Sequence, residues 1–177
     1  MNPAYDPKHS AGEVHFAISK LGIKKANTQA WQQLLLGILA GIYISFGAHA
    51  YLVAMEQHQG RIIAGAVFGV GLVLVIIAGA ELFTGNVTMV VGALTRLYSP
   101  GKMLSNWGIV YAGNFIGSYG VALLIWQSGL LGGGEAGLNP LGELAVSIAT
   151  AKLALPFWPA VIRGFLCNIL VLLAIIL

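Results

Sequence analysis

The sequence predicts an all-α integral membrane domain whose second membrane-spanning segment is broken. Of its 177 residues, 58% are hydrophobic and 8% are charged, whereas a soluble globular chain carries about 25% charged residues. Four apolar regions are long enough to cross a bilayer, which takes about 20 residues each. The second region is interrupted at residues 81–86 by a carboxylate, a glycine and an asparagine. We therefore expect one membrane domain without a separate soluble domain.

Residues 1–29 are predicted to form a cytoplasmic tail and an amphipathic helix. Residues 1–12 are polar and contain Pro3 and Pro7. In the helix expected at about residues 12–25, one face collects apolar side chains, namely Val14, Ala17, Ile18 and Leu21. Such a helix suits the membrane surface, and it equally suits packing on the rest of the protein.

The transmembrane domain is predicted to cover residues 30–177. Its four spans are expected at about residues 30–55, 61–97 with the break at 81–86, 103–131 and 153–177. Residues 132–150 contain glycines, Glu135 and Glu143 but no basic residue, and are expected to form a connector. Because the last span ends at Leu177 without a charged flank, we expect the domain to be truncated there.

The first and third spans contain small residues that suit close packing of membrane helices. In the first span these residues recur at intervals of three or four: Gly37, Gly41, Ser45 and Ala48. In the third span, Gly113 and Gly117 are four residues apart. Both patterns predict that each of these spans contacts a neighbouring helix closely.

Basic residues in the short loops predict the orientation of the chain. Four lysines precede the first span, and Arg96 and Lys102 lie between the second and third spans. The opposite side has Arg61, with Lys152 at its edge. Because basic loops stay in the cytoplasm, the N-terminus is predicted to be cytoplasmic and the chain multi-pass.

Enzyme and nucleic-acid functions are not expected. The sequence contains no recognisable nucleophile–base pairing, phosphate loop or zinc spacing, and Cys167 is its single cysteine. We therefore expect no catalytic residue, no metal site and no cofactor. The basic residues do not form a cluster interleaved with aromatic residues, so no nucleic-acid partner is expected. Permeation of a solute is the simpler interpretation.

The break at residues 81–86 is the main candidate site. A helix that breaks inside a bilayer exposes backbone groups, which is tolerated only in buried protein or beside a wet cavity. Glu81 is expected to anchor the insert by hydrogen bonds. Gly85 tolerates any backbone twist, and Thr84 and Asn86 are expected to satisfy freed backbone groups.

Bulky apolar residues flank the break or lie within it. They are Phe68, Leu72, Leu82 and Phe83. If these side chains face a pore, they make hydrophobic constrictions. At helical spacing they equally suit a core or a lipid-facing surface.

Three charged residues lie in or beside the apolar regions: Glu81, Lys152 and Arg163. Such residues are expected to pair with one another or with backbone carbonyls. A lysine beside a water-filled vestibule attracts anions, so Lys152 is the candidate for anion attraction. The alternative is that all three charges only hold helices together.

Three motifs resemble the formate/nitrite transporter family over nearly the whole chain. They are A-G-A-E-L-F-T-G-N at 78–86, N-W-G-I-V-Y-A-G-N-F-I-G at 106–117 and R-G-F-L-C-N-I-L-V at 163–171. The resemblance implies an aquaporin-like helical bundle, with four of an expected six spans present, assembled as a homopentamer with one pore per subunit. It also implies passage of small monovalent anions such as formate, nitrite or hydrosulfide, coupled to protons, across the bacterial inner membrane.

The resemblance also assigns roles to individual residues. Phe68 and Leu72 match apolar positions that border the pore. The loop inserted into the second span is matched by Leu82, Phe83 and Thr84. Lys152 matches the lysine that draws the anion into the vestibule, and Asn168 matches the supporting asparagine of the fourth span. The family's pore histidine lies on a fifth span, so the chain is expected to be the N-terminal part of such a protein.

Two alternatives remain open. One is a neutral-solute channel of aquaporin type, but the paired N-P-A motifs are missing, and Asn139-Pro140 is followed by Leu141. The other is a non-transporting membrane subunit, suggested by the abrupt end at Leu177. The anions of the first hypothesis share charge and size, so the sequence indicates their class rather than one member.

Overall fold

The computed structural model describes residues 11–133 and 137–176. Most of the predicted tail, together with Glu135 and Leu177, lies outside these residues. The described chain consists of helices, which confirms the all-α prediction. Their bounds are α1 Ala11–Asn27, α2 Ala30–Glu56, α3 Arg61–Ala78, α4 Phe83–Asn86, α5 Met89–Leu94, α6 Pro100–Gln127, α7 Pro140–Leu153 and α8 Phe157–Ile176.

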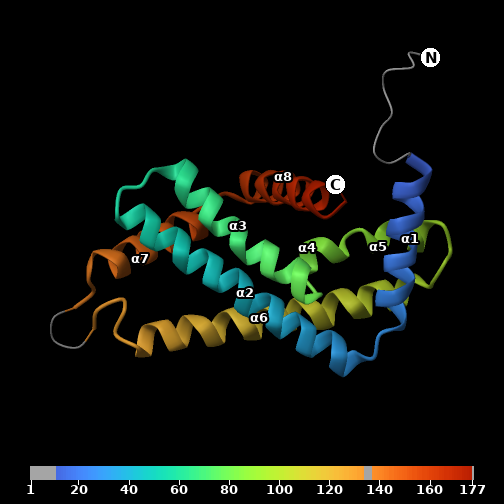
Figure 1. Ribbon diagram of the computed structural model, residues 1–177, viewed down its shortest axis with the longest axis horizontal. Helices are drawn as coiled ribbons and strands as arrows, with labels where there is room; N and C mark the ends of the chain where they lie inside the picture. The colour runs from blue at the N-terminus through green and yellow to red at the C-terminus, as the bar shows by residue number, and fades with distance from the viewer. Residues whose placement is uncertain (1–10, 134–136, 177) are drawn as a thin grey trace, which may run out of the picture.

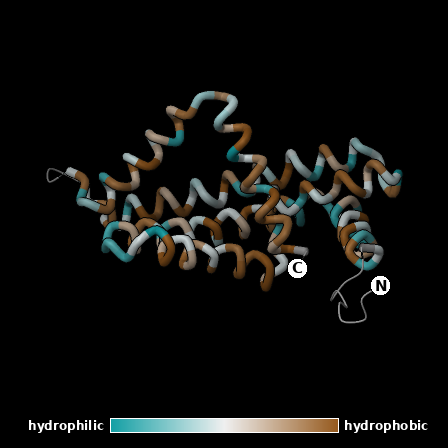
Figure 2. Tube along the Cα trace, turned by 90° about the horizontal axis from the view of Figure 1, so that it is seen from above, coloured by the Kyte–Doolittle hydropathy of each residue, from teal (hydrophilic) through white to brown (hydrophobic). Residues whose placement is uncertain are grey.

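Four of the described helices, namely α2, α3, α6 and α8, are long and apolar enough to cross a membrane. In Figure 2, hydrophobic residues predominate along the long helices. The α6 helix begins at Pro100, three residues before the predicted start of its span. Ser99 explains this start, because its side chain accepts a hydrogen bond from the Lys102 backbone N–H, and Pro100 occupies the first turn.

The second span is divided into α3, α4 and α5. After α3 ends at Ala78, Gly79 adopts a left-handed conformation with a φ of 65°, which glycine adopts without strain at Cβ. The non-helical segment therefore begins at Gly79, two residues before the predicted break. Residues 83–86, which were expected to be non-helical, form the single turn of α4.

The α2 helix lies between α3 and α6 (Figure 1) and packs against both. Glycines allow α2 and α6 to run in the same direction with their backbones in contact. A Cβ atom at Gly113 would lie 2.8 Å from the Leu34 carbonyl oxygen. Cβ atoms at Gly41 and Gly117 would collide with the backbone oxygens of Asn114 and Ile38. The small residues predicted to face a neighbouring helix thus join the first and third spans.

The α1 helix crosses one end of this bundle (Figure 1), where it packs on α5 and α6. Its buried positions are Ser19, Gly22 and Ala26, which are three or four residues apart and therefore share a face. The predicted apolar face is a different one: Val14, Ala17, Ile18 and Leu21 line a cavity beside the break. Thus α1 packs on the protein through small residues and turns its larger apolar residues toward the cavity.

The prediction of a connector at residues 132–150 is wrong for its second half. The α7 helix begins at Pro140, and Asn139 caps it by accepting a hydrogen bond from the Gly142 backbone N–H at 2.9 Å. A capping asparagine followed by proline is a helix-start signal. The helix packs on α2, at the opposite end of the bundle from α1 (Figure 1).

The α8 helix follows α7 after a short irregular segment that contains Pro156. It packs on α4, where a Cβ atom at Gly85 would lie 3.0 Å from Ile175 Cδ1. Many of its large apolar side chains, including Phe165 and Leu170, are exposed. The α8 helix thus exposes large apolar side chains, whereas the buried positions of α2 include several glycines.

Candidate functional site

One asparagine bonds to two of the backbone groups at the break. Asn114 of α6 donates from Nδ2 to the carbonyl oxygens of Gly37 at 2.8 Å and Glu81 at 2.9 Å. Its Oδ1 accepts from the Phe83 backbone N–H at 2.9 Å. The Glu81 backbone N–H donates to the Leu36 carbonyl oxygen at 3.1 Å. The break is therefore held against α2 and α6 by hydrogen bonds that replace those of a continuous helix.

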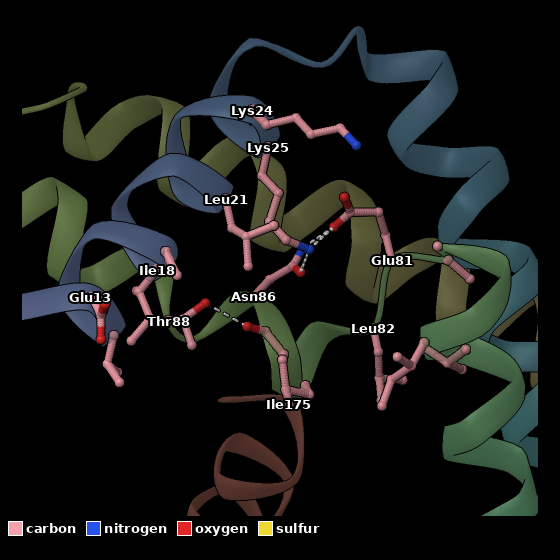
Figure 3. Close-up of a pocket in the computed structure, with 17 residues that line it drawn as sticks. Glu13, Ile18, Leu21, Lys24, Lys25, Glu81, Leu82, Asn86, Thr88 and Ile175 are labelled. Atoms are coloured by element: carbon pink, nitrogen blue, oxygen red, sulfur yellow. Dashed lines mark hydrogen bonds and ion pairs between the residues drawn. The ribbon is translucent and has the colours of Figure 1, made fainter. Parts of the chain in front are cut away.

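The Glu81 carboxylate is neutralised by a lysine from α1. Glu81 Oε2 lies 2.7 Å from Lys25 Nζ and accepts a second hydrogen bond from Asn86 Nδ2 at 2.7 Å. Lys25 Nζ also donates to Asn86 Oδ1 at 2.6 Å, as Figure 3 shows. Asn86 Nδ2 donates in turn to Asn106 Oδ1 at 2.8 Å. We call Lys25, Glu81, Asn86 and Asn106 the break network.

Three side chains of the break network are buried, and the hydrogen bonds determine which way its two amide groups point. Relative exposure is 7% for Glu81, 0% for Asn86 and 1% for Asn106. An ammonium group can only donate, so the Asn86 oxygen faces Lys25 and its amide nitrogen faces Glu81 and Asn106. The Asn106 oxygen then faces Asn86, and its own Nδ2 is a buried donor without a partner among the described residues. The charge of Lys25 therefore orients both asparagines.

The break network borders a cavity of about 400 Å³, the break cavity, between α1 and the end of α3. Figure 3 shows Leu21 and Ile18 of α1 on one side and Leu82 on the other. Lys25 and Glu81 also line this cavity, and their side chains are 18% and 10% exposed. The cavity is therefore apolar on much of its wall and has a neutral ion pair at its polar side.

A second cavity of about 430 Å³, the α7 cavity, lies between α2, α3 and α7. Lys152 and Phe68 both line it. The sequence placed Lys152 at the edge of the fourth span, but the lysine lies in the last turn of α7. Its side chain is exposed. The fold thus brings together an ammonium group and one of the predicted constriction residues, from positions far apart in the chain.

The remaining apolar candidates lie in different surroundings. Leu72 is half-buried on α3, one helical turn from Phe68 toward the break. The Phe83 ring packs edge-on against two rings of α6, with centroid distances of 6.0 Å to Trp107 and 5.6 Å to Tyr111. Leu82 is half-buried and immediately precedes α4. Phe83 therefore contributes to helix packing as well as to the insert.

Two polar candidates have buried oxygens that lack partners among the described residues, namely Thr84 Oγ1 and Asn168 Oδ1. The expectation that Thr84 satisfies a freed backbone group is therefore wrong for its hydroxyl, since Asn114 makes those bonds. Asn168 Nδ2 donates to the Gly164 carbonyl oxygen of its own helix at 2.8 Å. Both residues thus present unused hydrogen-bonding capacity.

Sequence reasoning missed the partner of Glu81. The expected pairing of Glu81 with Lys152 or Arg163 is wrong, because Lys25 makes the ion pair and Arg163 is exposed on α8. Lys25 was interpreted as a marker of orientation. A usable signal was present, because a carboxylate inside a membrane protein requires a cation or several donors, and the last turn of the first helix carries two lysines, Lys24 and Lys25.

Comparison with known proteins agrees with this architecture. A family model described as formate/nitrite transporter matches residues 12–177. The chain belongs to the formate/nitrite transporter family. It is 33% identical over 162 residues to the formate channel FocA of Escherichia coli strain K12, covering 87% of this chain and 55% of that protein.

Two further comparisons extend this result. The nitrite transporter NirC of Salmonella typhimurium is 37% identical over 143 residues, covering 77% of this family member and 51% of NirC. A solved structure titled FNT family ion channel is 28% identical, with a TM-score of 0.69, covering 82% of this chain and 59% of that one. This formate/nitrite transporter family chain thus spans little more than half the length of these relatives.

Proposed function

We propose that this chain forms part of a membrane channel or transporter for small monovalent anions such as formate, nitrite or hydrosulfide. The observation that best supports the proposal is the break in the second membrane span. The break borders a cavity, and the Lys25 ammonium there neutralises the Glu81 carboxylate. The relatives named a formate channel and a nitrite transporter support the class of permeant.

Lys152 is the residue to which we assign anion attraction. The Lys25 ammonium is shared between Glu81 and Asn86, so its charge is largely compensated. Lys152 is exposed and lines the α7 cavity with Phe68. A cation at the mouth of an apolar cavity raises the local concentration of anions. The proposed order is therefore attraction at Lys152 followed by entry past Phe68.

The apolar residues between the two cavities are proposed to form the constrictions. Phe68 and Leu72 on α3, with Leu82 and Phe83 at the break, present no charge to an ion. Transfer of a bare anion into such surroundings is costly, so uptake of a proton that neutralises a weak acid would ease its passage. The buried Thr84 hydroxyl, which has no partner among the described residues, is proposed to contact the permeant by a hydrogen bond. Protonation of the anion to its neutral acid, with the proton taken up from water, would make transport coupled to protons.

Supporting roles are proposed for the remaining candidates. Glu81, Gly85 and Asn86 anchor the insert, with the Glu81 and Asn86 side chains bonded to Lys25 and Gly85 leaving room for Ile175. Asn168 supplies a polar group from α8. No part of this proposal requires a metal or a cofactor.

The proposed assembly follows the family. It is an aquaporin-like bundle of six spans, a homopentamer in the lipid bilayer of the bacterial inner membrane, with a cytoplasmic N-terminus. The likeness to the FNT family ion channel, with a TM-score of 0.69, supports the bundle. The lysines before α2 and the basic residues between α5 and α6 support the orientation.

Flux measurements in proteoliposomes test this function. Formate, nitrite and hydrosulfide are supplied separately, and uptake is compared for the unaltered protein, Lys152→Ala and Arg163→Ala. Lys152→Ala should lower anion flux about tenfold, the lower end of electrostatic steering effects, whereas Arg163→Ala, a change to another exposed cation, should leave it unchanged. Equal flux in both variants would refute the role of Lys152.

The same vesicles test the two alternatives. Swelling driven by water or glycerol without any anion flux would favour a neutral-solute channel. Absence of every flux from correctly folded protein would favour a non-transporting subunit.

A further inference from the structure

Tyr98, in the turn between α5 and α6, occupies a slot between two glycines. A Cβ atom at Gly22 of α1 would lie 2.5 Å from Tyr98 Oη, and one at Gly92 of α5 would lie 2.6 Å from the same oxygen. Real Cβ atoms essentially never show contacts under 3.0 Å. Both positions therefore require glycine as long as the ring stays in place, and the ring end lies where α1 meets α5.

The ring is held in this slot by its hydroxyl group. Tyr98 Oη donates to the Met89 carbonyl oxygen at 2.6 Å, and Met89 is fully buried. Burial raises the pKa of the Tyr98 phenol above its usual value. The phenol thus remains neutral and able to donate throughout the ordinary pH range.

The slot lies on the face of α1 that also carries Lys25. Gly22 and Lys25 are three residues apart and therefore neighbours on the helix surface. Packing at Gly22 sets how closely α1 approaches the bundle, and the Lys25 ammonium makes two hydrogen bonds of 2.7 Å and 2.6 Å at the break. A shift of α1 away from the bundle would lengthen these bonds or force the Lys25 side chain into another rotamer. An exposed bond of 2.8 Å from Lys102 Nζ to Asn27 Oδ1 adds a second connection to the same helix end.

We propose that Tyr98 is a positioning residue that seats α1 against α5 and thereby holds Lys25 on Glu81 and Asn86. It acts through Lys25 and does not itself line the break cavity. Its importance for transport rests on the proposed function, whereas its effect on Lys25 does not.

The test measures how fast Lys25 reacts with a small amine-reactive ester, relative to Lys24 in the same molecule. Lys24 is exposed, whereas the Lys25 side chain is 18% exposed and ion-paired. Mass spectrometry of the intact reconstituted protein after digestion gives the labelling ratio. Tyr98→Phe keeps the ring and should raise the ratio about two- to tenfold, the range for loss of one hydrogen bond. Tyr98→Ala empties the slot and should raise it further.

The glycine supplies the decisive second variant. Gly22→Ala should raise the labelling ratio while Tyr98 is present, because its methyl group displaces the ring. It should add nothing to Tyr98→Ala, since the clash is then gone. The matched control is Gly108→Ala on α6, where an added Cβ meets no atom within 4 Å.

Two results would overturn the proposal. One is a labelling ratio in Tyr98→Phe and Gly22→Ala that equals the ratio of the unaltered protein. These two variants are the mildest changes, so the test relies on them if Tyr98→Ala does not fold. The other is an additive effect of Gly22→Ala and Tyr98→Ala. Anion flux measured on the same samples separates the two hypotheses, because a protein without flux would refute the proposed function while the labelling ratio still decides the role of Tyr98.

Discussion

The polar residues at the break and those on α7 and α8 have different environments. Glu81 and Asn86 are buried and bonded to side chains of α1 and α6. Arg163 on α8 is exposed, and the Asn168 amide donates back to its own helix. Lys152 is exposed at the end of α7. We refer to these as the break region, comprising α1 to α6, and the α7–α8 region.

Helix packing differs in the same way. In the most apolar 18-residue stretch of each helix, 22% of the residues are buried in α2 and in α6, but 0% are buried in α8. Gly41 and Gly117 lie against the backbone of the facing helix, whereas a Cβ atom at Gly164 of α8 would meet nothing within 4 Å.

This difference indicates where stability resides. A polar group in an apolar medium is tolerated only with partners, and the described chain supplies partners for the Glu81 carboxylate and for the backbone of residues 81 and 83. Substitutions there should therefore lower stability, and matched substitutions in the α7–α8 region should not. Four pairs of variants test this contrast, and unfolding in detergent is the common measurement.

The largest effect is expected for Glu81→Leu. Removing one partner of a buried ion pair typically costs about 3–5 kcal/mol, because the other charge is left without compensation. Here the Lys25 ammonium and the Asn86 amide would lose their acceptor. Denaturant titration should show this loss, and Glu143→Leu, at an exposed position of α7, should leave the free energy of unfolding nearly unchanged. Equal effects of the two variants would contradict the contrast.

The next largest effect is expected for Asn114→Leu. The change removes the acceptor for the Phe83 N–H and the donor for two carbonyl oxygens. Each buried group left unsatisfied costs about 1–3 kcal/mol. Because these three bonds are only partly buried, the low end applies to each, and the total should be about 3 kcal/mol. Asn168→Leu on α8 is the matched change, and its stability in the same titration should stay close to that of the unaltered protein. A smaller loss for Asn114→Leu than for Asn168→Leu would reverse the comparison.

Gly41→Ala should lower stability by about 1–3 kcal/mol, the usual range for overpacking. Its methyl group would collide with the Asn114 carbonyl oxygen of α6. Gly164→Ala on α8 is the control, because a Cβ at this position meets no atom within 4 Å. It should be unchanged or more stable, since alanine favours the helix. If the two variants behave alike in thermal unfolding, close packing of α2 and α6 is not important.

The smallest effect is expected for Trp107→Phe. The phenylalanine ring retains aromatic packing but loses the hydrogen bond from Nε1 to the Asn86 carbonyl oxygen, which measures 2.9 Å. One hydrogen bond contributes about 0.5–1.5 kcal/mol net. Trp158→Phe, at an exposed position on α8, should produce no measurable shift in the unfolding midpoint. A shift for Trp158 alone would show that α8 is better packed than its exposure indicates.

Much of the fold could be predicted because hydropathy and helix-start signals are local. The apolar runs located α2, α6 and α8, and the polar residues within the second run located the break. Residues 83–86 were misjudged because a single helical turn has no periodicity of its own. The α7 helix was missed because Asn139-Pro140, a helix-start signal, was interpreted as part of a loop. The face through which α1 packs on α5 and α6 was missed, since Ser19 and Gly22 are small rather than apolar.

The candidate site could be predicted only in part, because its members come from distant segments. The interruption of the second span selected Glu81 and Asn86, motif resemblance selected Lys152, and their roles remain predictions. Neither observation showed that Lys25, 56 residues from Glu81, would reach the carboxylate, or that Asn114 would bond to the backbone of residues 81 and 83. Periodicity describes which residues share a face of one helix, but not which other helix that face meets.

By itself the sequence determined that the chain is helical, membrane-embedded and interrupted in its second span, because each property depends on residues close together in the chain. The tertiary structure decided which groups compensate that interruption. The Glu81 carboxylate could in principle pair with any cation, and the packing of α1 on α5 and α6 brought Lys25 to it. Pairing depends on distance in space, and packing of the whole bundle sets that distance.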